Sequence, residues 1–115
     1  NALLQLFKQN NSLKTLVVTM GSKGCKATYG QKVLTAAGFG VKTKDTVGAG
    51  DTFWGAFLYQ ILSGNFDPYN PDERSLSEAL TFSNAARALS TTKSGAIPAM
   101  PMLDDILDLI KQHAG

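Results

Sequence analysis

Apolar and β-branched residues first gather in short runs that predict β-strands. Residues 16–20 form such a run between polar neighbours, which is typical of a buried strand with both faces covered. Residues 25–29 and 32–37 are strand-like runs on either side of Gly30-Gln31, which predicts a β-hairpin. Residues 41–44 indicate another short strand. This stretch of the chain is therefore expected to form a small sheet.

Helical spacing dominates the later segments. From about Gly50 to Leu62 the chain is apolar nearly all round, which is typical of a buried helix. A second helix is expected from Ser75 to about Thr91, with Ser75 or Ser77 as its N-cap. A last helix is expected from Met102 to Gln112. Its apolar residues share one face: Leu103, Ile106, Leu107 and Ile110.

Strands followed by helices predict an α/β fold. In such folds ligands bind at the carboxyl ends of parallel strands, where loops meet the N-termini of helices. This rule places residues 19–24 and 48–51 on one rim of the sheet. Residues 65–74 and 92–101 carry the prolines and glycines expected of loops.

Gly48, Ala49, Gly50 and Asp51 stand where the buried helix is expected to begin. The first amides of a helix have no acceptor within the helix, and the helix dipole adds partial positive charge there. Glycine lets the backbone approach a bulky oxyanion, so the turn is a candidate phosphate site. The carboxylate of Asp51 repels phosphate, but it is useful if it accepts a proton from the group that attacks the phosphate. The alternative is a plain glycine-rich turn followed by an Asp that the dipole favours.

Two common nucleotide-binding motifs are absent. The chain has no Gly-x-x-x-x-Gly-Lys-Ser/Thr run, which a P-loop requires. Gly48-x-Gly50 is followed by Phe53 where a dinucleotide fingerprint has a third glycine, and Gly38-x-Gly40 leads to Thr43. The turn at residues 48–51 is therefore of another kind.

Composition bounds the size and the setting of the chain. With 115 residues, residues 1–115 are expected to form a single, partial domain, because the chain opens at Asn1 inside an apparent helix over residues 2–9. A net charge of +2 is too small to favour nucleic acid or an anionic membrane as a partner. No apolar stretch reaches the length of about 20 residues that a transmembrane helix needs. Cys25 is expected to be a small buried strand residue, and a single cysteine fits a reducing, cytoplasmic setting.

Four segments together resemble the PfkB/ribokinase family of carbohydrate kinases. The run Asp45-Thr46-x-Gly48-Ala49-Gly50-Asp51-Thr52-Phe53-x-Gly55-Ala56 is similar to the family's C-terminal signature. Residues 18–25, 82–86 and 91–98 resemble the turn under the nucleotide, the adenine-pocket helix and the loop after it, and residues 91–98 are most like fructokinases. The resemblance implies a ribokinase-like three-layer α/β/α fold, of which this chain supplies the C-terminal part of a mostly parallel sheet with its flanking helices. It also implies ATP-dependent phosphorylation of a primary hydroxyl of a sugar.

The resemblance assigns roles to individual residues. Gly48, Ala49 and Gly50 would bind the oxyanions of the transferred phosphoryl group, and Asp51 would be the general base. The residues that would border the nucleotide are Thr19, Gly21, Ser22, Gly24, Gly50 and Asn84. The alternative for residues 19–24 is an ordinary turn at the end of a strand, and the alternative for Asn84 is an Asn on a helix surface.

Metal ions are implied as well. Magnesium usually accompanies phosphoryl transfer. Potassium is expected at Asp45 and at the carbonyls of Val47, Ser90, Lys93 and Gly95, although Ala99 stands where a hydroxyl often completes such a site. Asp45 could equally be a turn residue that caps its own backbone.

Alternatives to a fructokinase-like activity remain open in the sequence. A kinase specific for ribose or a nucleoside fits the same motifs, and a non-catalytic nucleotide-binding or assembly module would keep the fold without turnover. Either way, a sheet cut from its neighbours exposes a strand edge and apolar surface, so we expect this chain to form homo-oligomers.

Overall fold

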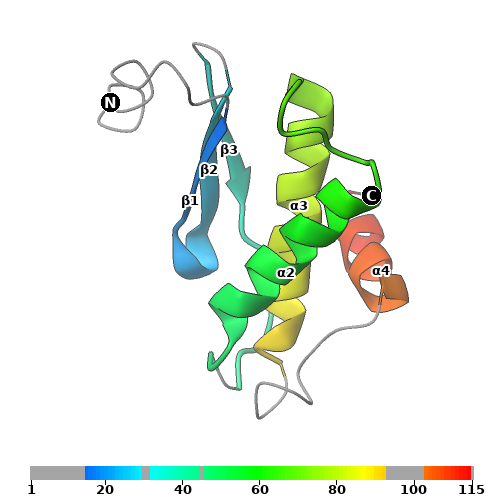
Figure 1. Cartoon of the computed structure of the whole chain (residues 1–115). Coiled ribbons are helices and arrows are strands. Elements are labelled where there is room, and N and C mark those ends of the chain that lie inside the picture. Colours follow the sequence, from blue (N-terminus) through cyan, green and yellow to red (C-terminus); the bar gives the residue numbers. More distant parts are fainter. Residues whose placement is uncertain (1–14, 30–31, 45, 93–102, 115) are drawn as a thin grey trace.

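The computed structural model describes residues 15–29, 32–44, 46–92 and 103–114 (Figure 1). They form strands β1 (Thr15–Thr19), β2 (Gly24–Tyr29) and β3 (Lys32–Ala37), the 3-10 helix η1 (Gly21–Lys23), and helices α2 (Ala49–Leu62), α3 (Glu73–Ser90) and α4 (Leu103–Ala114). The α/β class and the predicted helices after residue 48 are confirmed. The expected helix at residues 2–9 and most of the loop at 92–101 lie outside the described residues.

The strands form a three-stranded sheet in the order β1-β2-β3. Both pairings are antiparallel, with Val17 opposite Ala27 and Ala27 opposite Leu34. The predicted pairing of residues 25–29 with 32–37 is thereby confirmed. The parallel part of the expected sheet is not among the described strands.

Helices α2 and α3 cover one face of this sheet (Figure 1). Cys25 and Ala27 of β2 are fully buried against Phe53 of α2 and Leu80 of α3, in a core that also holds Phe57, Phe66, Leu76 and Ala79. Burial of a large apolar side chain stabilises a fold by about 1.5–3 kcal/mol, so this cluster is the main source of stability. The prediction for Cys25 is confirmed.

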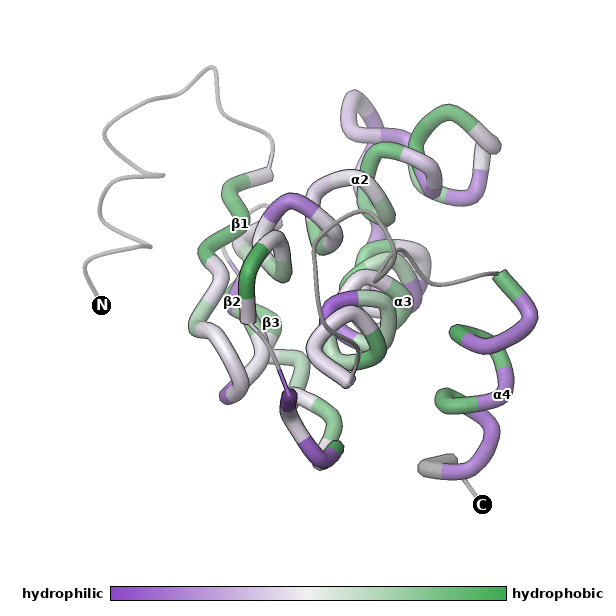
Figure 2. Tube along the Cα trace, turned by 90° about the horizontal axis from the view of Figure 1, so that it is seen from below, coloured by the Kyte–Doolittle hydropathy of each residue, from purple (hydrophilic) through white to green (hydrophobic). Residues whose placement is uncertain are grey.

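Helix α4 packs on α3 away from the sheet (Figure 1). Ile106 and Leu109 are buried against Phe82 and Ala85 of α3. Figure 2 shows the apolar residues of α4 on the side toward α3 and hydrophilic residues on the far side. The predicted face is only partly right, because Leu103 and Leu107 are about half exposed. The buried stripe runs through positions 106, 109 and 110 instead.

Two expectations of burial are wrong within the described residues. Val18 of β1 is 43% exposed, because helices cover only one face of the sheet. On α2, Trp54 and Leu58 are about half exposed and Leu62 is 77% exposed. The apolar residues of α2 do surround the helix, but the sheet and α3 bury only the side that carries Phe53 and Phe57.

Two local predictions also need correction. Residues 41–44 form no strand. The amide of Lys44 donates to the carbonyl of Thr91 at 2.6 Å and not to a neighbouring strand, and Gly38 and Gly40 precede this segment. Helix α3 begins at Glu73, earlier than predicted, with Asp72 as its N-cap. The carboxylate of Asp72 accepts from the amide of Ser75 at 2.9 Å and from its hydroxyl at 2.6 Å.

No helix in the described part of the chain is long and apolar enough to cross a membrane.

Replacement of Asp72 by Ala should lower the Tm by a few degrees at pH 7, because the first turn of α3 loses its cap. The hydrogen bonds from Ser75 lower the pKa of Asp72 below its ordinary value of 3.8. The lowered pKa means that this stabilisation is present above about pH 4 and is lost as the pH falls through the folded-state pKa. Thermal unfolding followed by circular dichroism at pH 7 and pH 3 should show the difference from wild type shrink at pH 3. Asp72→Asn, which keeps a capping side chain, is the control, and an unchanged Tm in Asp72→Ala at pH 7 would contradict the assignment.

Candidate functional site

The start of α2 is an open hydrogen-bond donor site. Gly48 is the N-cap, with φ of +79° in the left-handed region that favours glycine, and no side chain caps the helix. The amide of Ala49 donates to Thr46 at 3.2 Å and that of Thr52 to Gly48 at 2.9 Å. Within the described residues, the amides of Gly50 and Asp51 donate to no acceptor. Two N–H groups and the positive end of the helix dipole are therefore available to an anion.

Buried neighbours hold this turn in place. The hydroxyl of Thr52 donates to the carbonyl of Gly48 at 3.0 Å, and Thr52 and Phe53 are both buried. Among the described residues outside its own turn of helix, no atom lies within 4 Å of the position that a β-carbon at Gly50 would occupy. The side chain of Asp51 is exposed and makes no hydrogen bond or ion pair within the described residues. The carboxylate of Asp51 therefore lies next to two backbone amides, those of Gly50 and Asp51, and none of these groups has a hydrogen-bond partner among the described residues.

The turn between β1 and β2 carries Thr19, Gly21, Ser22 and Gly24. Gly21 and Gly24 have φ of +61° and +104°. A side chain at Gly24 would collide with the carbonyl of Ala36, so packing within the sheet explains that glycine. A side chain at Gly38 would likewise collide with the carbonyl of Ser22. The turn is thus tied to the segment that follows β3.

A cavity of about 260 Å³ lies beside this turn. Three segments that are far apart in the sequence meet there: η1, the stretch after β3 and the C-terminal turn of α3. Its lining residues are Ser22, Gly38, Phe39, Gly40, Val41, Thr43, Arg87, Ala88 and Thr91. The structure therefore brings Ser22 together with residues that the sequence did not single out.

Asn84 is not a helix-surface residue, because it is only 2% exposed. Its amide nitrogen donates to the carbonyls of Ala36 and Ala37 at 3.1 and 3.2 Å, which ties α3 to the end of β3. Its side-chain oxygen is buried without a partner among the described residues. Burial raises the pKa of the nearby Cys25 thiol to about 11, and a hydrogen bond with Asn84 partly offsets this.

The expected potassium site is only partly described. Asp45, Lys93 and Gly95 lie outside the described residues. Val47 is 63% exposed, while Ser90 is buried and its hydroxyl donates to the carbonyl of Arg87 at 2.7 Å. No group of three His, Cys, Asp or Glu side chains in the described ranges could hold a metal ion.

Figure 1 shows the β1–β2 turn, the start of α2 and the end of α3 in the same half of the molecule. The bond from Lys44 to Thr91 joins the chain before the α2 turn to the cavity wall. Phe39 and Arg87 were not predicted from the sequence, whereas Thr91 begins the segment 91–98 that resembles a nucleotide-side loop. The available signals were the Gly-Phe-Gly stretch after β3 and the three-residue spacing from Asn84 to Arg87, which places both on neighbouring positions of one helix face.

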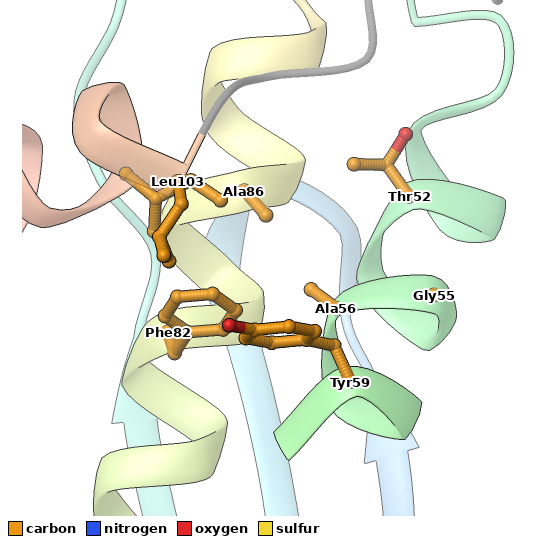
Figure 3. Close-up of a pocket in the computed structure, with 8 residues that line it drawn as sticks. Thr52, Gly55, Ala56, Tyr59, Phe82, Ala86 and Leu103 are labelled. Carbon is orange, nitrogen blue, oxygen red and sulfur yellow. The ribbon is translucent and has the colours of Figure 1, made fainter. Parts of the chain in front are cut away.

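A second cavity, of about 280 Å³, lies between α2, α3 and α4 (Figure 3). Tyr59 stacks on Phe82 there, with ring centroids 5.8 Å apart. Its described lining is Thr52, Gly55, Ala56, Tyr59, Phe82, Ala86, Leu103 and Ile106. None of these residues is charged, so this cavity is unsuited to a phosphate.

Known proteins with similar sequences and structures include fructokinases and ribokinases. Fructokinase-2 of Solanum lycopersicum is 47% identical over 103 residues, which are 90% of this chain and 31% of the relative. A fructokinase structure from Xylella fastidiosa with bound ATP matches with a TM-score of 0.83 and 30% identity, covering 100% of this chain and 37% of the other. A ribokinase from Thermotoga maritima matches with a TM-score of 0.75 and 30% identity, over 94% of this chain and 33% of the other.

These matches cover nearly all of this chain but only about a third of the relatives' length. They confirm the fold as ribokinase-like. Residues 1–103 match the family described as pfkB family carbohydrate kinase. The chain therefore belongs to the pfkB family of carbohydrate kinases.

Proposed function

We propose that this chain supplies the nucleotide-binding and catalytic part of a kinase that transfers phosphate from ATP to a primary hydroxyl of a sugar. Fructose is the first candidate, because the similar proteins include a fructokinase with bound ATP and a plant fructokinase. One structural observation carries the proposal: within the described residues, the amides of Gly50 and Asp51 have no acceptor, and they lie beside the exposed carboxylate of Asp51.

In this proposal the α2 turn binds the phosphoryl group that is transferred. Phosphoryl transfer depends mostly on positioning and on stabilisation of charge, and backbone amides at a helix N-terminus supply both. The amides of Gly50 and Asp51 would donate to oxygens of the γ-phosphate, while Gly48 and Ala49 shape the turn. The hydrogen bond from the hydroxyl of the buried Thr52 to the carbonyl of Gly48 would help to hold these amides in place.

Asp51 would act as the general base. The sugar hydroxyl oxygen forms a bond to the γ-phosphorus, the bond from that phosphorus to the β–γ bridging oxygen breaks, and ADP leaves. The hydroxyl proton goes to the carboxylate of Asp51. Exposure of Asp51, with no partner among the described residues, leaves it free to accept that proton.

The cavity beside η1 would take the nucleoside part of ATP, bordered by Thr19, Gly21, Ser22 and Gly24. Ser22 lines it directly, and Gly21 lies at its edge beside Arg87. The side-chain oxygen of Asn84, one turn before Arg87 on α3, is a buried acceptor without a partner among the described residues, and a hydrogen-bond donor would satisfy it. Polar and apolar lining residues together suit a nucleoside.

Metal ions would enter with the nucleotide. Magnesium binds phosphates through one or two carboxylates and several waters, so it needs no dedicated protein cage. Asp45 and the carbonyls of Val47, Ser90, Lys93 and Gly95 would hold potassium beside the α2 turn and add positive charge there. A cytoplasmic setting fits such a kinase and the buried, free Cys25.

The exposed stripe Trp54, Leu58 and Leu62 on α2 supports a further part of the proposal, that this chain self-associates. These residues recur every four positions, so they share one face of the helix. No residue of α2 after Asp51 is charged, so no like charges would oppose a second copy. Among the described strands, β1 pairs with β2 alone, which leaves its other edge for pairing.

Asp51→Asn should lower kcat for fructose-dependent ADP release about 10²–10⁴-fold, because the proton acceptor is lost. The dissociation constant for ATP should change little, since the amides remain. Asp104→Asn, in the first turn of α4, is the charge-matched control and should keep wild-type kcat. Turnover retained in Asp51→Asn would eliminate Asp51 as the base, and ATP binding without turnover in the wild type would favour a binding module. Ribose and adenosine, assayed in parallel, test the other acceptor classes.

Gly48→Ala should destabilise the chain by about 1–2 kcal/mol through left-handed backbone strain and should weaken ATP binding by distorting the turn. Gly64→Ala has the same φ of +79° in a loop, so it should lose similar stability but keep ATP affinity. Gly55→Ala, inside α2 and facing open space, should be neutral or stabilising. Chemical denaturation and ATP titration measure both effects, and equal ATP affinities in Gly48→Ala and Gly64→Ala would count against the anion turn.

Sedimentation should show the wild-type chain as a concentration-dependent oligomer, and Leu58→Glu should shift it toward the monomer by placing a charge in the stripe. Tyr69→Glu, which places the same charge at an exposed apolar position in the loop before α3, should leave the distribution unchanged. A clean wild-type monomer at high concentration would rule out this part of the proposal.

A further inference from the structure

Arg87 is a cation in the wall of the cavity beside η1. It lies near the end of α3, where its neighbours Ala86 and Ala88 are buried and Arg87 itself is half-buried. Its Nη2 atom lies 3.7 Å from the position that a β-carbon of Gly21 would occupy. Its guanidinium therefore reaches across the cavity from α3 to η1.

The guanidinium has no partner within the described part of the chain. Neither a hydrogen bond nor an ion pair links it to another described residue, and none of the described lining residues is acidic. A guanidinium carries five N–H donors and no acceptor. A half-buried group of this kind is stabilised by a ligand that presents acceptors, and a bidentate acceptor fits it best.

The position of the cavity favours the base of a nucleotide over its phosphates. The cavity lining does not include the α2 turn at residues 48–51, which is the anion site. Phe39, Val41 and Ala88 supply apolar walls that suit the flat face of a base. Arg87 is then the residue that contacts the edge of that base.

The chemistry of the edge distinguishes the purines. Guanine and hypoxanthine present two neighbouring acceptors, O6 and N7, which a guanidinium binds with two hydrogen bonds. Adenine presents N7 beside an amino group, which is a donor like the guanidinium itself. We propose that Arg87 reads the base of the phosphoryl donor and shifts the preference of this chain toward 6-oxopurine nucleotides such as GTP. The inference rests on the proposed function, because it concerns the donor of the same reaction.

The test exchanges the hydrogen-bonding pattern at position 87. Gln presents one donor and one acceptor, the pattern that matches adenine. Arg87→Gln should therefore raise the dissociation constant for GTP roughly tenfold relative to that for ATP. Arg87→Lys keeps the charge without the bidentate fork, so it should also lose the preference for GTP. Arg74→Gln is the matched control, because Arg74 is on the same helix, exposed and remote from the cavity.

Direct titration of GTP and of ATP against the folded chain measures the ratio of their dissociation constants and requires no turnover. Circular dichroism verifies the fold of each variant. A GTP-to-ATP ratio that is the same in wild type and in both Arg87 variants overturns this inference, while ATP binding and turnover that depend on Asp51 leave the proposed function standing. Absence of binding of either nucleotide by the folded wild-type chain overturns both. If Arg87→Gln fails to fold, the ratio in Arg87→Lys decides the question alone.

Discussion

The burial of α3 is the constraint on which the rest of the structure depends. One side of this helix places Leu76 and Leu80 in the core against the sheet and α2, and another side places Ala85 and Ala86 against α4. Removal of one such buried leucine typically costs about 2–5 kcal/mol, a large share of the stability of a small domain. The same helix carries Arg87 and Ala88 and ends at its C-cap Thr91, so its packing also sets one wall of the candidate nucleotide cavity.

The polar contacts of α3 complete what apolar packing begins. Asn84 donates to two carbonyls at the end of β3, and the carbonyl of Thr91 accepts from Lys44. These bonds hold the start and the end of residues 38–44, which connect β3 to the α2 turn, against α3. Residues 38–44 pair with no strand of the sheet. Hydrogen bonds to α3 and its C-cap stand in place of the strand pairing that the sequence of residues 41–44 suggests.

The exposed apolar surface of the chain has a simple physical origin. Helix α2 is apolar nearly all round, yet the described chain offers it neighbours on one side only. The chain spans about a third of the length of its relatives, and its core covers the residues nearest to α3 and the sheet. Trp54, Leu58 and Leu62 therefore keep much of their surface in water, which favours contacts with other molecules.

The sequence by itself determined the elements and the α2 turn, because both depend on local rules. Hydrophobic spacing predicted β1, β2, β3 and the three helices, and the glycine-rich run predicted a helix start whose first amides lack intrahelical acceptors. Of the amides expected to bind an anion, that of Ala49 donates to Thr46 instead, while those of Gly50 and Asp51 have no acceptor within the described residues. Tertiary structure decided the rest. The side on which α2 is buried, the role of Asn84 as a link to β3, and the cavity formed by Ser22, Arg87 and Thr91 all join residues tens of positions apart. Such contacts depend on how helices and strands pack, and the spacing of residues along the chain does not carry that information.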